Sequence, residues 1–275
     1  MKNSNWLLLQ TPPSSAAFNM ALDEALLHWH SEGKIPPVLR LYEWDNPTLS
    51  LGYFQRSKEL NETYISDKNM SVVRRLTGGR TVLHDDELTY SVVLKEDYEN
   101  MPKNVVEAYK VLSEGLLIGL QNIGIPVRFS LPENIDIESL KNPKSSVCFD
   151  ASSYYEIILE GKKVIGSAQT RQRGVILQHG SIPLSFDVQA MFASVNFPSE
   201  KIRNRLEKSF GKKAGAINEI LETEYTISRI REGLIYGFSK ALSVEFDEFI
   251  LSESQLSYVE KLEQKYLSEE WNTYR

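Results

Sequence analysis

The chain has 275 residues, enough for one large domain or two small ones with a substantial core. Its formal net charge of -6 and its pI near 5.4 argue against a nucleic-acid or anionic-membrane surface. The N-terminal segment has an apolar run of only four residues, too short for a secretory signal, and eighteen apolar residues never occur together. We therefore expect a cytoplasmic protein that binds neither nucleic acid nor membrane.

An amphipathic helix is predicted over residues 18–29, where apolar side chains recur at helical spacing. Ser14 or Ser15 can cap its start. Asp23 and Glu24 fall off the apolar stripe, so they are expected to point away from the core.

Strands are predicted mainly in the middle of the chain, at 38–44, 48–53, 72–75, 88–94, 154–159, 163–169 and 175–184. Between them, helices are expected at 59–67 and 105–124. A turn at Glu160-Gly161 would place Lys163 opposite Ile158 in a hairpin. Residues 130–147 lack any period and suggest a long ordered loop or a mobile lid.

After Ser185 the pattern becomes mainly helical. A helix over 227–242 and a short strand at 244–246 precede a last helix, for which Ser252 and Gln255 form a capping box. Because the strands cluster between 38 and 184, an α+β domain fits better than alternating βαβ units. We expect a mixed, largely antiparallel sheet flanked by helices, in a catalytic domain of residues 1–250 with a helical C-terminal extension at 251–275.

A glycine turn at Gly78-Gly79 is the most unusual local feature. The pair permits positive φ and close approach of a ligand to the backbone. Arg75 precedes it, and Arg80 and His84 follow it, so donors and titratable groups surround a turn without side chains. This concentration favours a ligand cradle; the alternative is a solvated hairpin whose glycines are structural.

Cys148 is the only cysteine, which excludes an internal disulfide. A lone cytosolic cysteine is most often a small buried apolar residue, but its neighbours PKSSVCFDASS are polar and loop-like, which suits an accessible nucleophilic thiol. Such a thiol needs a nearby cation to ionise, and the predicted hairpin brings Lys163 within reach. From spacing alone, the usual interpretation of Lys162 and Lys163 is that both are solvated hairpin lysines.

His84 and His179 each follow an apolar run and adjoin a turn. Either could line a pocket or move a proton, and either could be a hydrogen-bonded structural histidine. The residues alone leave both interpretations open.

Three blocks together resemble the biotin/lipoate protein ligase and octanoyltransferase superfamily: FNMALDEALL at 18–27, RRLTGGRTVLHDDELTYSV at 74–92 and GKKVIGSAQTRQRGVILQHGSIPL at 161–184. Within it, SSVCFDASSYYEI at 145–157 resembles the LipM-type octanoyltransferases, which carry a nucleophilic cysteine in this loop. LipL-type amidotransferases and ATP-dependent lipoate ligases are the rival types.

The resemblance implies a cofactor-free, monomeric enzyme that takes an octanoyl group from octanoyl-acyl carrier protein onto Cys148 as a thioester. It then passes the group to a lysine of a lipoyl domain, such as that of the glycine-cleavage H protein. Lys163 matches the family's catalytic lysine and is expected to lower the pKa of the Cys148 thiol. The resemblance further implies that substrate is bound by residues of the second and third blocks, namely Arg75, Gly78, Gly79, Arg80, His84, Gly166, Ser167, Ala168, His179 and Gly180.

Overall fold

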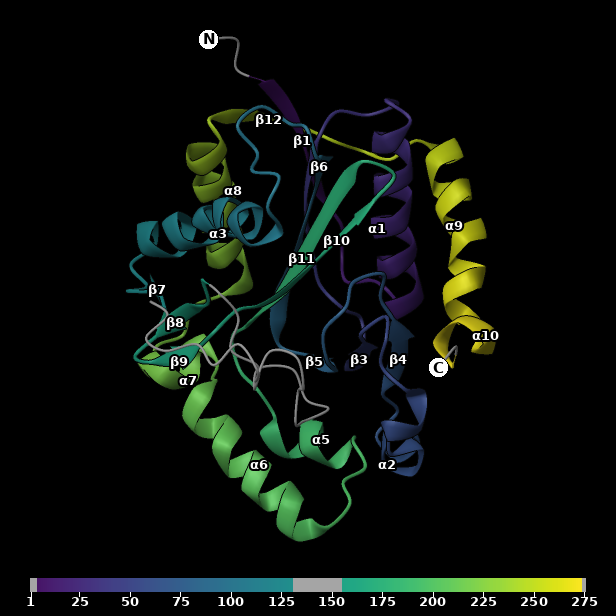
Figure 1. Ribbon diagram of the computed structural model, residues 1–275, viewed down its shortest axis with the longest axis vertical. Helices are drawn as coiled ribbons and strands as arrows, with labels where there is room; N and C mark the ends of the chain where they lie inside the picture. The colour runs from purple at the N-terminus through teal and green to yellow at the C-terminus, as the bar shows by residue number, and fades with distance from the viewer. Residues whose placement is uncertain (1–3, 131–154, 274–275) are drawn as a thin grey trace.

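The computed structural model describes residues 4–130 and 155–273. Its centre is a six-stranded sheet in the order β10-β11-β6-β2-β1-β12 (Figure 1). The strands are β1 (Ser4–Gln10), β2 (Val38–Tyr42), β6 (Glu87–Lys95), β10 (Gly166–Gln172), β11 (Val175–Pro183) and β12 (Val244–Glu248). Neighbours are antiparallel from β10 to β2 and parallel from β2 to β12. The expected α+β fold with a mixed, largely antiparallel sheet is confirmed.

Helices cover both faces of this sheet, as Figure 1 shows. On one side α3 (Val105–Asn122) packs on α8 (Ile227–Leu242), and on the other α1 (Ala16–Ser31) packs on α9 (Glu253–Leu267). Ser15 caps α1, and Ser252 with Gln255 forms the predicted capping box of α9. No helix within the described ranges combines the length and the apolar character that a bilayer crossing requires.

Two three-stranded sheets flank the central one. The first consists of β3 (Thr48–Leu51), β4 (Ser71–Arg74) and β5 (Val82–His84), and the second of β7 (Arg128–Phe129), β8 (Ile157–Leu159) and β9 (Lys162–Lys163). The other helical elements of the described residues are η1 (Ser57–Glu59), α2 (Glu62–Asp67), α5 (Val188–Ala193), α6 (Glu200–Lys213), α7 (Ile217–Leu221) and α10 (Glu269–Asn272). Ile158 lies opposite Lys163, as the predicted hairpin required.

The strand pattern differs from the expectation in two respects. The predicted strands 72–75 and 88–94 do not pair, because β4 lies parallel to β3 in the first small sheet whereas β6 lies in the central sheet. The glycine turn leads instead from β4 to β5, which was not predicted and pairs with the other side of β3. In addition, β1 was not predicted, since its apolar run is short. It nevertheless occupies the sheet interior between β2 and β12, with Trp6 fully buried.

The two faces of β6 differ in chemistry. Leu88, Tyr90 and Val92 belong to the core beneath α3 and α8. The alternate residues Glu87, Thr89 and Ser91 are also buried, although they are polar. Arg40 of β2 and His179 of β11 both lie opposite Ser91 in the strand register, which aligns polar side chains across three strands. This row forms the base of a candidate site.

Candidate active site

A pocket of about 50 Å³ opens over this polar row, next to the glycine turn. It is lined by Met20, Tyr42, Trp44, Ser50, Arg75, Gly79, Val82, His84, Thr89, Gly166, Ser167, Ala168, His179, Gly180 and Ser181. Eight of the ten residues that the resemblance assigned to substrate binding are in this lining. The other two, Gly78 and Arg80, lie on the same turn outside it.

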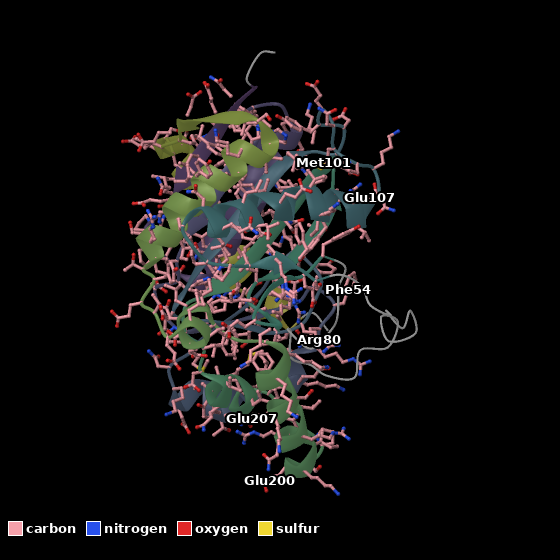
Figure 2. All side chains as sticks on the ribbon, turned by 90° about the vertical axis from the view of Figure 1, so that its left-hand side faces the viewer. Phe54, Arg80, Met101, Glu107, Glu200 and Glu207 are labelled. Carbon is pink, nitrogen blue, oxygen red and sulfur yellow. The ribbon has the colours of Figure 1, made fainter. Side chains whose placement is uncertain are left out.

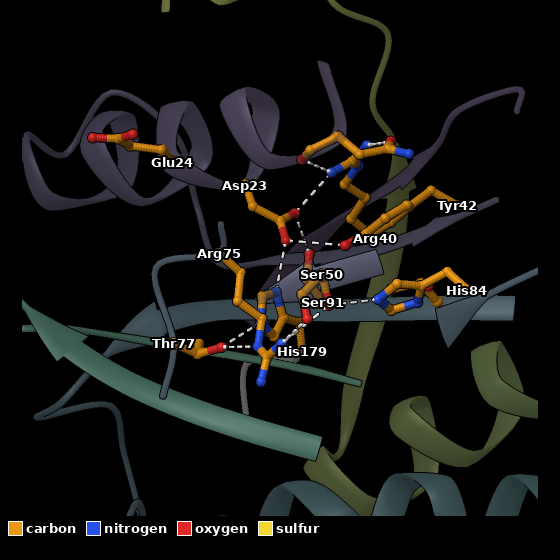
Figure 3. A network of polar contacts seen from close by, with 12 residues as sticks. Asp23, Glu24, Arg40, Tyr42, Ser50, Arg75, Thr77, His84, Ser91 and His179 are labelled. Carbon is orange, nitrogen blue, oxygen red and sulfur yellow. Dashed lines mark hydrogen bonds and ion pairs between the residues drawn. The ribbon is translucent and has the colours of Figure 1, made fainter. Parts of the chain in front are cut away.

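Asp23 lies at the centre of a buried polar network (Figure 3). The prediction that Asp23 and Glu24 point away from the core is wrong, because they are only 1% and 8% exposed. The Asp23 carboxylate accepts a hydrogen bond from Arg40 at 2.8 Å and lies 3.0 Å from Nδ1 of His179. Tyr42 and Ser91 also donate to it. Burial opposes ionisation, but the Arg40 guanidinium and His179 outweigh it and hold the pKa of Asp23 below its usual value.

His179 joins this network to the glycine turn. Its Nε2 lies 2.7 Å from Oγ1 of Thr77, on the opposite side of the ring from Asp23. Burial lowers the pKa of His179, against the opposing effect of the Asp23 carboxylate, so the ring is neutral near pH 7. A proton on Nδ1, shared with Asp23, leaves Nε2 as the acceptor of the Thr77 hydroxyl.

A second hydroxyl, histidine and carboxylate series lies across the pocket. Ser50 Oγ is 2.8 Å from Nε2 of His84, and His84 Nδ1 is 2.8 Å from Oε1 of Glu87. Thr89 donates to the same carboxylate and accepts from the indole of Trp44, whose ring stacks on His84 at 4.2 Å. Burial opposes ionisation of Glu87, but His84 and the hydroxyl donors lower its pKa overall. Both histidines therefore line the pocket and are fixed by hydrogen bonds.

Arg75 connects the two series and holds the glycine turn. Its guanidinium donates to the Oγ1 of Thr77 and to both the carbonyl and the hydroxyl of Ser50. It also donates to the carbonyl oxygens of Gly78 and Arg80, at 2.9 and 2.8 Å. All five guanidinium N–H groups have an acceptor, so this arginine shapes the turn. Thr77 and Ser50 accept from Arg75, which leaves their own protons for the histidines.

Two glycines allow the loops at the pocket mouth to meet. Gly79 has φ +96°, and a Cβ there would lie 2.8 Å from the Arg75 guanidinium. At Gly52 a Cβ would lie 2.0 Å from the carbonyl oxygen of Gly79. Backbone contact this close requires glycine. On the same rim, Gly78 approaches the exposed ring of Phe54, and Figure 2 shows Phe54 and Arg80 on one side of the molecule.

Lys163 lies on β9 outside the pocket lining. It is 7% exposed, and its Nζ is 2.9 Å from Oε1 of Glu156. A solvated hairpin lysine is therefore the wrong description of this residue. Cys148 and most of the expected loop at 130–147 lie outside the described residues.

Several residues of the site were not selected from the sequence, namely Asp23, Arg40, Ser50, Thr77 and Glu87. One signal was available: Arg40 interrupts the apolar strand VLRLY, and a buried arginine requires a carboxylate or several carbonyl oxygens. Ser50 and Thr77 carried no comparable signal, because hydroxyl side chains are common in strands and turns.

Comparison with known proteins places this geometry in a family. A family model described as the lipoyl protein ligase A/B catalytic domain matches residues 15–239. The chain belongs to this family. The octanoyltransferase LipM of Bacillus subtilis (strain 168) is 51% identical over 275 residues, with 99% of each chain covered. LipM of Bacillus anthracis is 50% identical over the same length and coverage.

Solved structures agree with this membership of the lipoyl protein ligase A/B family. A bipartite lipoate protein ligase from Thermoplasma acidophilum, from a study that includes its E2 lipoyl domain, superposes with a TM-score of 0.79. It is 26% identical and covers 99% of this chain and 97% of its own. Every residue of the pocket lies inside the family match, whereas α9 and α10 follow it.

Proposed function

We propose that this member of the lipoyl protein ligase A/B family is a cytoplasmic octanoyltransferase of lipoate biosynthesis. Identity of 51% to LipM of Bacillus subtilis, over nearly the whole length of both chains, carries the proposal. Octanoyl-acyl carrier protein is the proposed donor. The acceptor is a lysine on a lipoyl domain, such as that of the glycine-cleavage H protein. The E2 lipoyl domain studied with the Thermoplasma ligase supports this acceptor class.

The proposed reaction has two acyl transfers. The Cys148 thiolate attacks the donor thioester carbonyl, the bond from that carbon to the donor sulfur breaks, and the carrier thiolate leaves and takes up a proton. The neutral amine of the acceptor lysine then attacks the acyl-enzyme carbonyl, and the bond from that carbon to the Cys148 sulfur breaks. The amide forms as the nitrogen passes one proton to solvent, and the Cys148 thiolate is released. The first transfer converts one thioester into another and is nearly isoenergetic. The second converts a thioester into a more stable amide, so neither transfer needs ATP.

Lys163 is the proposed cation for this chemistry. A cation near a thiol lowers the pKa of that thiol, and a donor aimed at a developing oxyanion stabilises the transition state. Two observations support the assignment. The side chain is buried, and its ion pair with Glu156 fixes the ammonium in one place.

The pocket is the proposed site of the octanoyl chain. Burying the seven carbon groups beyond the carbonyl contributes about 5 kcal/mol before costs, at roughly 0.8 kcal/mol each. The cavity of about 50 Å³ is smaller than the ~150 Å³ that accommodates one benzene. Entry of the octanoyl chain therefore requires the side chains that line the pocket to move apart. The flexible side chain of Met20 is suited to that movement.

Intact-mass analysis tests the proposal. Wild-type protein incubated with octanoyl-acyl carrier protein should gain one octanoyl mass, and addition of a lipoyl domain should move it to that domain. Cys148→Ser should gain no stable octanoyl group and transfer nothing. An unmodified wild type would remove the proposal. Loading only from an octanoylated lipoyl domain would indicate an amidotransferase, and a Cys148→Ala variant active with lipoate and ATP would indicate a ligase.

A further inference from the structure

Helix α6 has a continuous stripe of cations. Lys201, Arg205, Lys208 and Lys212 recur at intervals of four, three and four residues, which places them on one face of the helix. All four are exposed, and the stripe extends over about 16 Å at 1.5 Å per residue. The opposite face packs inward through Leu206 and Phe210. We call these four residues the cationic stripe.

The stability of α6 does not explain the cationic stripe, because only Lys212, in the last turn, lies where the helix dipole favours a cation. Like charges three and four residues apart repel, and Lys201 lies in the first turn, where the helix dipole disfavours a cation. The two acidic residues of α6, Glu200 and Glu207, are labelled in Figure 2. Glu207 pairs with Arg203, which is outside the stripe. Among the described residues, no carboxylate lies within ion-pair distance of the four cations.

The stripe leads to the candidate catalytic lysine. The chain leaving α6 at Ala214 pairs with β9 at Lys163, and the Gly215 amide donates to the Lys163 carbonyl at 3.1 Å. A Cβ at Gly215 would lie 3.4 Å from the side chain of Lys162. A protein docked along the stripe is therefore held beside the hairpin that carries Lys163.

We propose that the cationic stripe docks the acidic acyl carrier protein that delivers the octanoyl thioester. This inference rests on the proposed function and adds the surface on which its donor binds. The chain as a whole carries a net charge of -6 and repels an acidic protein, whereas α6 has six basic and two acidic side chains and attracts one. Attraction confined to one helix orients the carrier as it approaches.

Because the cationic stripe lies away from the pocket, it suits the donor, acyl carrier protein, better than the acceptor, a lipoyl domain. α6 packs mainly on α5 and β9, and no residue of these three elements lines the pocket, so a docked protein must deliver its acyl group from a distance. A carrier protein holds that group on a long flexible prosthetic arm. An acceptor lysine extends only by its own side chain, so its domain must sit on the pocket mouth.

The test compares charge reversal on the stripe with charge reversal elsewhere. The stripe variant is Arg205→Glu with Lys208→Glu. The matched control is Lys103→Glu with Lys261→Glu, two exposed lysines away from α6 that give the same change in net charge. The rate of Cys148 octanoylation is followed by intact mass at low and high salt. Two donors are used: octanoyl-acyl carrier protein and the uncharged small thioester octanoyl-N-acetylcysteamine.

At low salt the stripe variant should be acylated about tenfold more slowly than wild type by the carrier protein, and at the wild-type rate by the small thioester. Added salt should slow wild type and the control but leave the stripe variant nearly unchanged. Equal slowing with both donors, no slowing with either, or a loss confined to transfer to the lipoyl domain would each overturn the inference.

If neither donor acylates wild type, the proposed function fails, and the stripe is judged by binding alone. Fluorescence anisotropy of labelled acyl carrier protein then compares the three proteins. Binding lost only in the stripe variant supports the docking surface, and equal binding by all three overturns it.

Discussion

Oδ2 of Asp23 lies 3.0 Å from Nδ1 of His179, a contact between residues 156 positions apart in the chain. It joins the helix that covers the sheet to the strand that lines the pocket. Because the same carboxylate also holds Arg40, one side chain sets the positions of a pocket histidine and of a buried cation.

Asp23→Asn should lower the free energy of unfolding by about 3–5 kcal/mol, because it leaves Arg40 buried without a countercharge. Tyr42→Phe is the matched control, since it removes a single hydrogen bond to the same carboxylate and should cost about 1 kcal/mol. Urea denaturation followed by tryptophan fluorescence measures both. Equal costs for the two variants would contradict the assigned role of the ion pair.

Acid should destabilise the protein through His179. Its pKa in the folded state lies below 6.5, so the unfolded state binds more protons as the pH falls below 6.5. The free energy of unfolding should therefore fall on acidification, by at most about 1.4 kcal/mol per pH unit for this one group. Urea denaturation at a series of pH values measures this dependence. Between about pH 5.5 and 7.5, the free energy of unfolding of His179→Gln should change less with pH than that of wild type. If the free energy of unfolding of the two proteins depends equally on pH, His179 is protonated in both the folded and the unfolded state or in neither.

Gly52→Ala should slow octanoyl transfer, because its methyl group would meet the carbonyl of Gly79 at 2.0 Å and force the two loops apart. Overpacking of this kind costs about 1–3 kcal/mol, and a further loss of activity would follow from the displaced glycine turn. Gly211→Ala is the control, since nothing lies within 4 Å of its Cβ position. Transfer rates and denaturation midpoints of both variants provide the comparison.

Lys163→Ala should shift iodoacetamide labelling of Cys148 to higher pH, because the thiol would lose its stabilising cation. Lys162→Ala removes the neighbouring charge on the same hairpin and should leave the labelling profile in place. A profile that moves in neither variant, or equally in both, would rule out Lys163 as the specific partner of the thiol.

Truncation tests the expected boundary at residue 250 between the catalytic domain and the helical C-terminal extension. Arg74 is fully buried and donates to the carbonyl oxygens of Trp271 and Asn272, and Glu24 accepts from Lys265 and Tyr266 of α9. A chain ending at residue 250 should therefore be destabilised by several kcal/mol, since two charges lose buried partners. Trp271→Ala is the milder variant for denaturation measurements. A truncated chain with the stability of the full protein would establish residues 1–250 as an independent domain.

The sequence predicted much of the fold, because local signals determined it. Ser15 caps α1, the capping box opens α9, and the turn at Glu160-Gly161 places Lys163 opposite Ile158. Partners distant in sequence were not predictable. Helical periodicity assigned Asp23 to solvent, since a buried carboxylate is favourable only when a cation such as Arg40 comes from another element.

The candidate site was predicted in part for the same reason. The glycine turn and both histidines stood out locally and line the pocket. The hydroxyls of Ser50 and Thr77 acquire a role only when Arg75 and the two histidines converge on them in space. The turn itself leads from β4 to β5, which lie on opposite sides of β3 in one small sheet, an arrangement that no property of its own sequence determines.

The pairing of β1 with β12 also governs how the molecule is assembled in the cell. At roughly 5–20 residues per second, a ribosome finishes β12 on the order of tens of seconds after β1 has been made. During that interval one edge of β1 has backbone groups without their native partners, so the nascent chain offers an open strand to its neighbours on the polysome.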